Sequence, residues 1–114
     1  MRRKIVMEKI EKTIRYTKLF NLYGVLLSDA QQAILSDYFF ADLSISEISL
    51  DKGISRAAVE DALSKGIKKL DAFEEALHLL DKNEKIRAKS EQLLEKLTNL
   101  DDIKLLKEIM EELD

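Results

Sequence analysis

This chain has no proline and only three glycines among its 114 residues, and this shortage of turn residues limits its fold more than any other feature. Proline and glycine end helices and build tight turns, so a β-protein with many turns is excluded and long helices are expected. The chain length fits one small domain with a modest core. Charged residues make up 36% and hydrophobic residues 46%, a composition typical of helical proteins in water. The sequence therefore predicts an all-α fold.

Other absences limit the chemistry and the location of the protein. The chain has no cysteine, which removes disulfides, thiolate metal sites and thiol nucleophiles and fits a reducing compartment. No apolar run approaches the roughly 18 residues that cross a bilayer. The apolar segment Ile5–Met7, which follows a basic start, is too short for a secretion signal. We therefore expect a cytoplasmic protein without membrane contact, whose natural start is either Met1 or Met7.

Apolar residues recur at spacings of three and four along most of the chain, and residues that favour helix starts interrupt them. This pattern predicts a bundle of about five or six helices. In chain order we place them at about residues 7–26, 28–40, 44–51, 55–80, 81–98 and 103–113.

The fourth predicted helix is unusually long and leads into a separate C-terminal part. At about 25 residues it would extend on the order of 38 Å, which exceeds the core of a small domain. The sequence Asp81–Glu84 resembles a helix start, and residues 99–102 interrupt the pattern that follows. We therefore expect a helical domain at residues 1–80 and a C-terminal helical arm at residues 81–114, either a hairpin or one bent helix.

Residues 44–70 have the features of a helix-turn-helix. Ser44–Glu47 forms a capping box, Gly53 suits the left-handed backbone that ends a helix, and Ser55 offers the next N-cap. Ile48 and Val59 are spaced to pack across the angle between the two helices. Gly66 lies inside the second helix, where it marks either a close helix crossing or a surface position.

Several segments carry a resemblance to DNA-reading proteins. Residues 27–35, 43–49 and 53–59 read LSDAQQAIL, LSISEIS and GISRAAV. Across residues 27–70 they resemble the promoter-reading fourth region of bacterial sigma factors. In such a domain the exposed front of the second helix of the motif enters the major groove.

With Thr17–Gly24 and Asp37–Phe40 added, the chain more closely resembles the small YlxM-like family of Gram-positive bacteria, over roughly residues 8–95. The resemblance implies a sigma-like helical fold and no enzymatic activity. It also implies a link to the signal recognition particle, through either its RNA or its GTPase.

The second helix of the motif supplies candidate nucleic-acid contacts. They are Arg56, Ala57, Glu60, Lys65, Lys68 and Lys69. Arg56 suits guanine or phosphate, and the lysines suit the nucleic-acid backbone. Glu60 and Asp61 would repel phosphates, so this front predicts weak binding to DNA. A regulatory protein that binds nucleic acid and a scaffold that now binds protein are both consistent with this pattern.

A second basic cluster lies on the first helix. Lys9, Lys12, Arg15 and Lys18 follow one another at spacings of three, which places them on one slowly drifting strip. Lys12 and Arg15 are candidate contacts to a DNA or RNA backbone. The alternative is that the strip is simply the solvated face of an amphipathic helix.

The chain has more apolar rows than one small core needs, so we expect a homo-oligomer, most simply a dimer. The candidate interface residues are Leu77, Leu80, Leu93, Leu97 and Leu100. His78 is the only histidine, and no pair of acids, metal-ligand cluster or phosphate loop is recognisable. We therefore expect no catalytic site, no metal and no cofactor.

Overall fold

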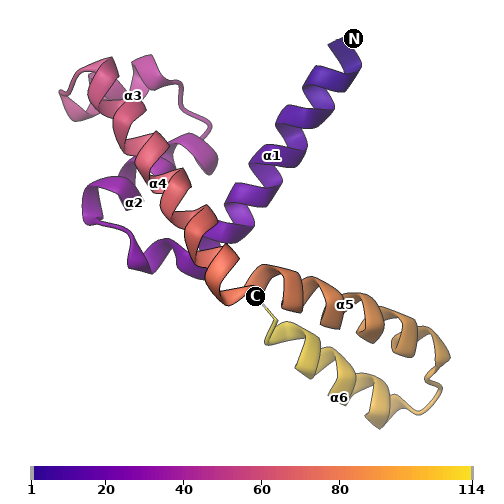
Figure 1. Ribbon diagram of the computed structural model, residues 1–114. Coiled ribbons are helices and arrows are strands. Elements are labelled where there is room, and N and C mark those ends of the chain that lie inside the picture. The colour runs from indigo at the N-terminus through magenta and orange to yellow at the C-terminus, as the bar shows by residue number, and fades with distance from the viewer. Residues whose placement is uncertain (1, 114) are drawn as a thin grey trace. The chain divides into compact units, whose positions relative to one another are not determined.

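A computed structural model describes the backbone of residues 2–113 and the side chains of residues 8–113. Every regular element in this range is helical, which confirms the all-α fold (Figure 1). The elements are α1 (Arg2–Tyr23), the 3₁₀ turn η1 (Gly24–Leu26), α2 (Asp29–Phe39), α3 (Ile45–Lys52), α4 (Arg56–Leu77), α5 (Leu79–Lys96) and α6 (Leu100–Glu111). They form two compact units, Met1–Leu77 and His78–Asp114. None of the described helices is long and apolar enough to span a membrane.

The first unit is assembled on α4, because α1, α2 and α3 all pack against it (Figure 1). The inward face of α4 carries Val59, Leu63 and Leu70, which are buried. The other three helices add the core side chains Tyr16, Leu19, Tyr23, Ile34, Leu35 and Ile48. Since α3 has only eight residues, too few for a stable helix alone, its packing on α4 is what stabilises it.

The predicted helix-turn-helix is confirmed in α3, the turn and α4. The Ser44 side chain accepts from the Glu47 N–H, and the Glu47 carboxylate accepts from the Ser44 N–H, both at 3.1 Å. Gly53 ends α3 with a φ of 65°, the left-handed conformation that a residue with a Cβ adopts only at a cost. Ile48 and Val59 are fully buried on the two packed helices.

Gly66 marks a close crossing of α4 over α2. A Cβ at this position would lie 2.7 Å and 3.0 Å from the two terminal methyl carbons of Leu35. Leu35 has no exposed surface, so it has little freedom to move away. Of the two roles that the sequence left open for Gly66, the structure supports the helix crossing.

Two tyrosines of α1 bind carboxylates of α4, a pairing that the sequence analysis did not predict. The Tyr16 hydroxyl donates to Asp71 Oδ2 at 2.9 Å, and the Tyr23 hydroxyl donates to Glu74 Oε1 at 2.7 Å. Tyr23 and Glu74 are both buried, so this hydrogen bond satisfies polar groups that would otherwise lose water without compensation. The two bonds fix α1 against the C-terminal half of α4.

The bounds of the first predicted helix need correction. It begins at Arg2 rather than near Met7, and its α-helical part ends at Tyr23 rather than Leu26. The chain tightens into η1 at Gly24, where a Cβ would lie 3.2 Å from the Phe20 ring. The missing side chain lets the backbone turn closely over Phe20.

The junction after α4 was also predicted in the wrong place. Helix α4 ends at Leu77 rather than near Leu80, because His78 adopts a left-handed conformation with a φ of 55°. Helix α5 then begins at Leu79, so the cap expected at Asp81 is wrong. Asp81 lies in the first turn of α5 and forms an ion pair with Lys85 at 2.9 Å.

The second unit is a helical hairpin, which decides between the two forms expected for the C-terminal arm. The Asn99 side chain caps α6 by accepting from the N–H groups of Asp101 and Asp102, at 2.9 Å and 3.1 Å. Asn83, near the start of α5, donates to the backbone carbonyl of Leu113, beyond the end of α6. The two helices therefore run in opposite directions.

Candidate nucleic-acid interface

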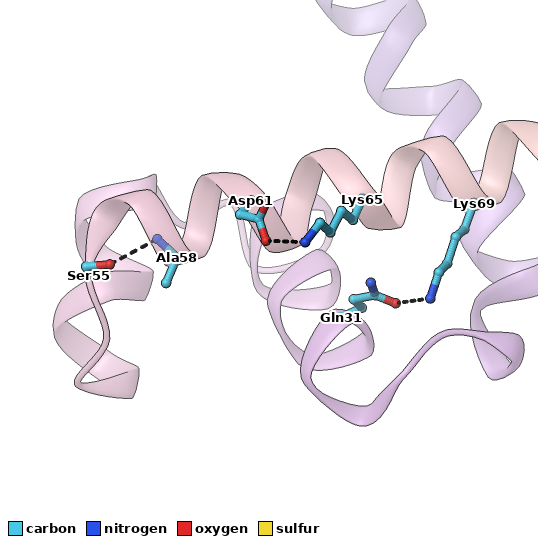
Figure 2. A network of polar contacts seen from close by, with 6 residues as sticks. All are labelled: Gln31, Ser55, Ala58, Asp61, Lys65 and Lys69. Atoms are coloured by element: carbon cyan, nitrogen blue, oxygen red, sulfur yellow. Dashed lines mark hydrogen bonds and ion pairs between the residues drawn. The ribbon is translucent and has the colours of Figure 1, made fainter.

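The outward face of α4 carries the contacts predicted for the second helix of the motif. Arg56, Ala57, Glu60, Lys65, Lys68 and Lys69 are all exposed. The Ser55 side chain accepts from the Ala58 N–H at 3.0 Å, which fixes the first turn of the helix (Figure 2). The structure thus presents all six residues to solvent from a rigid helix.

Two of the lysines have partners within the first unit. Lys65 Nζ lies 3.0 Å from Asp61 Oδ2, one turn earlier on α4 (Figure 2). Lys69 Nζ lies 3.2 Å from Gln31 Oε1, which belongs to the capping box of α2. Both contacts are at the surface, where an ion pair such as Lys65–Asp61 contributes about 0–1 kcal/mol. Each lysine would therefore lose little stabilisation on leaving its partner.

The ion pair with Lys65 also changes the electrostatics expected for this face. The sequence predicts weak binding to DNA because Glu60 and Asp61 are adjacent. Lys65 offsets the charge of Asp61, so Glu60 is the carboxylate that still opposes phosphate. Within residues 8–113 no acidic side chain pairs with Arg56 or Lys68. These two cations are the ones most available for an anion.

The first helix of the motif contributes no free cation to this face. Its single basic residue, Lys52, lies 3.2 Å from Asp37 Oδ2 on α2, and both side chains are about three-quarters buried at 27% exposure. This pair ties α3 to α2 rather than pointing a charge outward. The candidate contacts of the motif are therefore confined to α4.

The basic strip of α1 lies in the same unit. The side chains from Glu8 to Arg15 are all exposed, including Lys12 and Arg15, whereas Tyr16 is buried. The hydrogen bond from Tyr16 to Asp71 anchors α1 directly after Arg15. The strip is thus held on the folded unit at its C-terminal end.

A hollow beside this strip was missed by the sequence analysis. It has a volume of about 350 Å³, and its lining includes Lys9 and Lys12 from α1 and Tyr38 and Phe39 from α2. The sequence shows only three adjacent aromatics, Tyr38, Phe39 and Phe40, at the end of a predicted helix. Their position next to α1 depends on tertiary packing.

The described part of the chain contains no group of three or more His, Cys, Asp or Glu side chains placed to hold a metal ion.

A protein-family model described as "Putative helix-turn-helix protein, YlxM / p13 like" matches residues 10–112. This chain belongs to the YlxM/p13-like family.

Curated relatives agree with this YlxM/p13-like assignment. A UPF0122 protein of Bacillus cereus strain AH187 is 35% identical over 109 residues, which cover 92% of this chain and 99% of that protein. A UPF0122 protein of Lactococcus lactis strain MG1363 is 42% identical over 89 residues, 78% of this chain and 77% of that protein. A third, from Mycoplasma capricolum, is 43% identical over 75 residues, 66% of each chain.

The family match extends past the region on which the predicted resemblance rested. It spans both units of the YlxM/p13-like protein, so the C-terminal hairpin belongs to the family pattern together with the helix-turn-helix. The resemblance to the YlxM-like family is therefore confirmed.

The candidate interface leucines of this YlxM/p13-like protein differ in their exposure. Leu93 and Leu100 of the hairpin are exposed, and Leu97 is half-buried. Leu77, at the end of α4, is also exposed, whereas Leu80 is only 6% exposed. Leu77, Leu93, Leu97 and Leu100 are therefore the candidates with exposed surface, and their contact with a second copy stays a prediction.

Proposed function

We propose that this protein is a non-enzymatic helix-turn-helix adapter that binds nucleic acid through α4 and the basic strip of α1. The observation that supports this proposal most directly is the outward face of α4, where Arg56 and Lys68 are exposed and Asp61 is offset by Lys65. Binding to a nucleic acid gains its free energy chiefly by replacing condensed counterions with such cations.

Within this proposal the protein acts in the cytoplasm with the signal recognition particle. The basis is the resemblance to the YlxM-like family, which implies a link to the particle's RNA or to its GTPase. Arg56, Lys68 and Lys69 on α4, together with Lys12 and Arg15 on α1, would contact the phosphates, and Lys65 would offset Asp61 beside them. Glu60 would weaken contact to a regular duplex, which favours an adapter with modest affinity over a promoter-reading protein.

The test is fluorescence anisotropy with two labelled ligands, a random DNA duplex and the RNA of the signal recognition particle, at low and at physiological salt. Arg56→Glu and Lys12→Glu should each weaken binding and reduce the salt slope, by about 1 for each phosphate that the variant no longer neutralises. Lys104→Glu on α6 is the matched control, since it reverses the charge of an exposed lysine outside both faces. Wild-type protein that binds neither ligand at physiological salt would refute the proposal.

A second candidate function is a homo-oligomeric scaffold that binds protein and keeps the helix-turn-helix only as a core. It is favoured by the exposed leucines of the hairpin, of which Leu100 is 81% exposed. Sedimentation at micromolar concentration should then show a dimer that Leu93→Asp dissociates and that tolerates high salt. A monomer under these conditions rejects the scaffold and leaves the adapter as it stands.

A further inference from the structure

The hollow next to the basic strip combines aromatic rings with cations. Its volume of about 350 Å³ falls within the roughly 300–1,000 Å³ of small-ligand pockets. It continues into a second hollow of about 290 Å³, and the two share Thr13, Tyr38 and Phe39 in their linings. Together they form one groove between α1 and the corner where α2 leads into α3.

Tyr38 supplies an aromatic surface in this groove. Its side chain is 40% exposed, unusual for a ring that packs in a core. The Tyr38 ring meets the Phe39 ring edge to face, at a centroid distance of 5.1 Å and an interplanar angle of 88°. Phe39 is in turn held by Tyr16, at a centroid distance of 5.9 Å. The contact with Phe39, which itself packs on Tyr16, therefore fixes the orientation of the Tyr38 ring. Part of the ring remains exposed and accessible to a ligand.

The charges in the groove are divided between its two ends. Lys9 and Lys12 line the first hollow and are exposed, so this end attracts an anion. Asp42 and Glu47 line the second hollow, and Glu47 already accepts the N–H of Ser44. The lysine end therefore suits an anionic group, and the exposed ring of Tyr38 suits an uncharged, planar group.

We propose that this groove binds an unpaired nucleotide, whose base stacks on Tyr38 and whose phosphates are held by Lys9 and Lys12. A base that is still stacked and paired in a duplex has no open face to offer to a side chain. Aromatic stacking next to basic side chains is instead how proteins bind single strands. The inference deepens the proposed function, on which it rests, by naming single-stranded segments of RNA or DNA as the ligand class.

The test compares a labelled 12-nucleotide single-stranded RNA, the single-stranded DNA of the same sequence and the DNA duplex, by anisotropy at physiological salt. Tyr38→Leu, which keeps apolar volume but removes the π face, should weaken binding of the single strands by about 5-fold or more. The same variant should leave duplex binding within about 2-fold, whereas Lys12→Glu should weaken both. The two single strands show whether the 2′-hydroxyl contributes to binding.

Two variants control for folding and for general aromatic effects. Tyr38→Phe keeps the ring and should bind single strands like the wild type. Phe40→Ala removes a neighbouring exposed ring that packs on Phe20 at 5.4 Å and does not line the groove, so it should also bind like the wild type. A single strand with 2-aminopurine should lose fluorescence on binding to wild type and to Tyr38→Phe, but much less on binding to Tyr38→Leu.

The failures of the two proposals are distinguishable. If the wild type binds nucleic acid but Tyr38→Leu retains full affinity for single strands, the groove is not a base site and the adapter function stands. Binding to the duplex alone would likewise reject the base site and leave the adapter function in place. If no ligand binds to the wild type, the adapter function fails and the groove proposal fails with it.

Discussion

Because Gly66 has no Cβ, α4 can pack closely against α2 at this position. Gly66→Ala would remove the cost of a helical glycine, about 1 kcal/mol, but would push a methyl group to 2.7 Å from a buried Leu35 carbon. Overpacking of this kind costs about 1–3 kcal/mol, so we expect a net loss of stability of up to about 2 kcal/mol. Urea unfolding measures this loss, and Ser64→Ala at an exposed position of the same helix is the control. An increase in stability would show that Leu35 adapts freely.

The hydroxyl of Tyr16 makes the stability of the fold depend on pH in the alkaline range. Burial raises the pKa of its hydroxyl, and the hydrogen bond to the Asp71 carboxylate and the charge of that carboxylate raise the pKa further. A group whose pKa is raised on folding contributes its full stabilisation below its unfolded pKa, which is about 10 for tyrosine. This contribution to stability is lost as the pH rises through the folded pKa. The wild type should therefore lose stability above about pH 10. Tyr16→Phe should lose less over the same range.

The measurement for Tyr16 is urea unfolding at several pH values between 7 and 11. Tyr38→Phe, which removes a different tyrosine hydroxyl, serves as the control and should follow the wild-type profile. Identical pH profiles of Tyr16→Phe and the wild type would mean that this hydroxyl is not linked to folding.

At the scale of whole helices, local signals predicted the starts of α2, α3 and α4 within one residue, whereas the predicted starts of α1, α5 and α6 and the ends of α1 and α4 were wrong by two to five residues. The capping box at Ser44 and the cap at Ser55 were found because each depends on residues only three positions apart. The break at His78 was missed, because neither glycine nor proline marks it and a histidine does not itself specify a left-handed backbone.

The conformation of His78 leads to a prediction for this junction. A residue with a Cβ loses about 1–2 kcal/mol in the left-handed region, and glycine avoids this loss but gives up more entropy on folding. His78→Gly should therefore stabilise the protein slightly, by about 0.5 kcal/mol, whereas His78→Ala, which keeps the Cβ, should not. Thermal unfolding of the two variants checks this. Equal stabilisation by both would point to the imidazole instead of the backbone.

For the molecule as a whole, sequence reasoning found the helix-turn-helix and the exposed cations on α4, because both follow from helical periodicity along one element. Contacts between different helices were not predicted. The Tyr16 and Asp71 partners are 55 residues apart, and the groove at Tyr38 forms only where α2 meets α1. Such contacts depend on how helices pack, which periodicity within a single helix does not specify.

The division of the chain into two units predicts that residues 1–77 fold without the hairpin. The core that holds α1, α2 and α3 on α4 lies entirely within this segment, as do the hydrogen bonds from Tyr16 to Asp71 and from Tyr23 to Glu74. A fragment of residues 1–77 should therefore unfold cooperatively on heating, followed by circular dichroism. If the adapter function is correct, it should also keep its affinity for nucleic acid within about 3-fold, since every proposed phosphate contact lies in this unit. Loss of cooperative unfolding would show that the first unit depends on α5 and α6. A folded fragment that no longer binds would instead place the interface on the hairpin, where the exposed leucines lie.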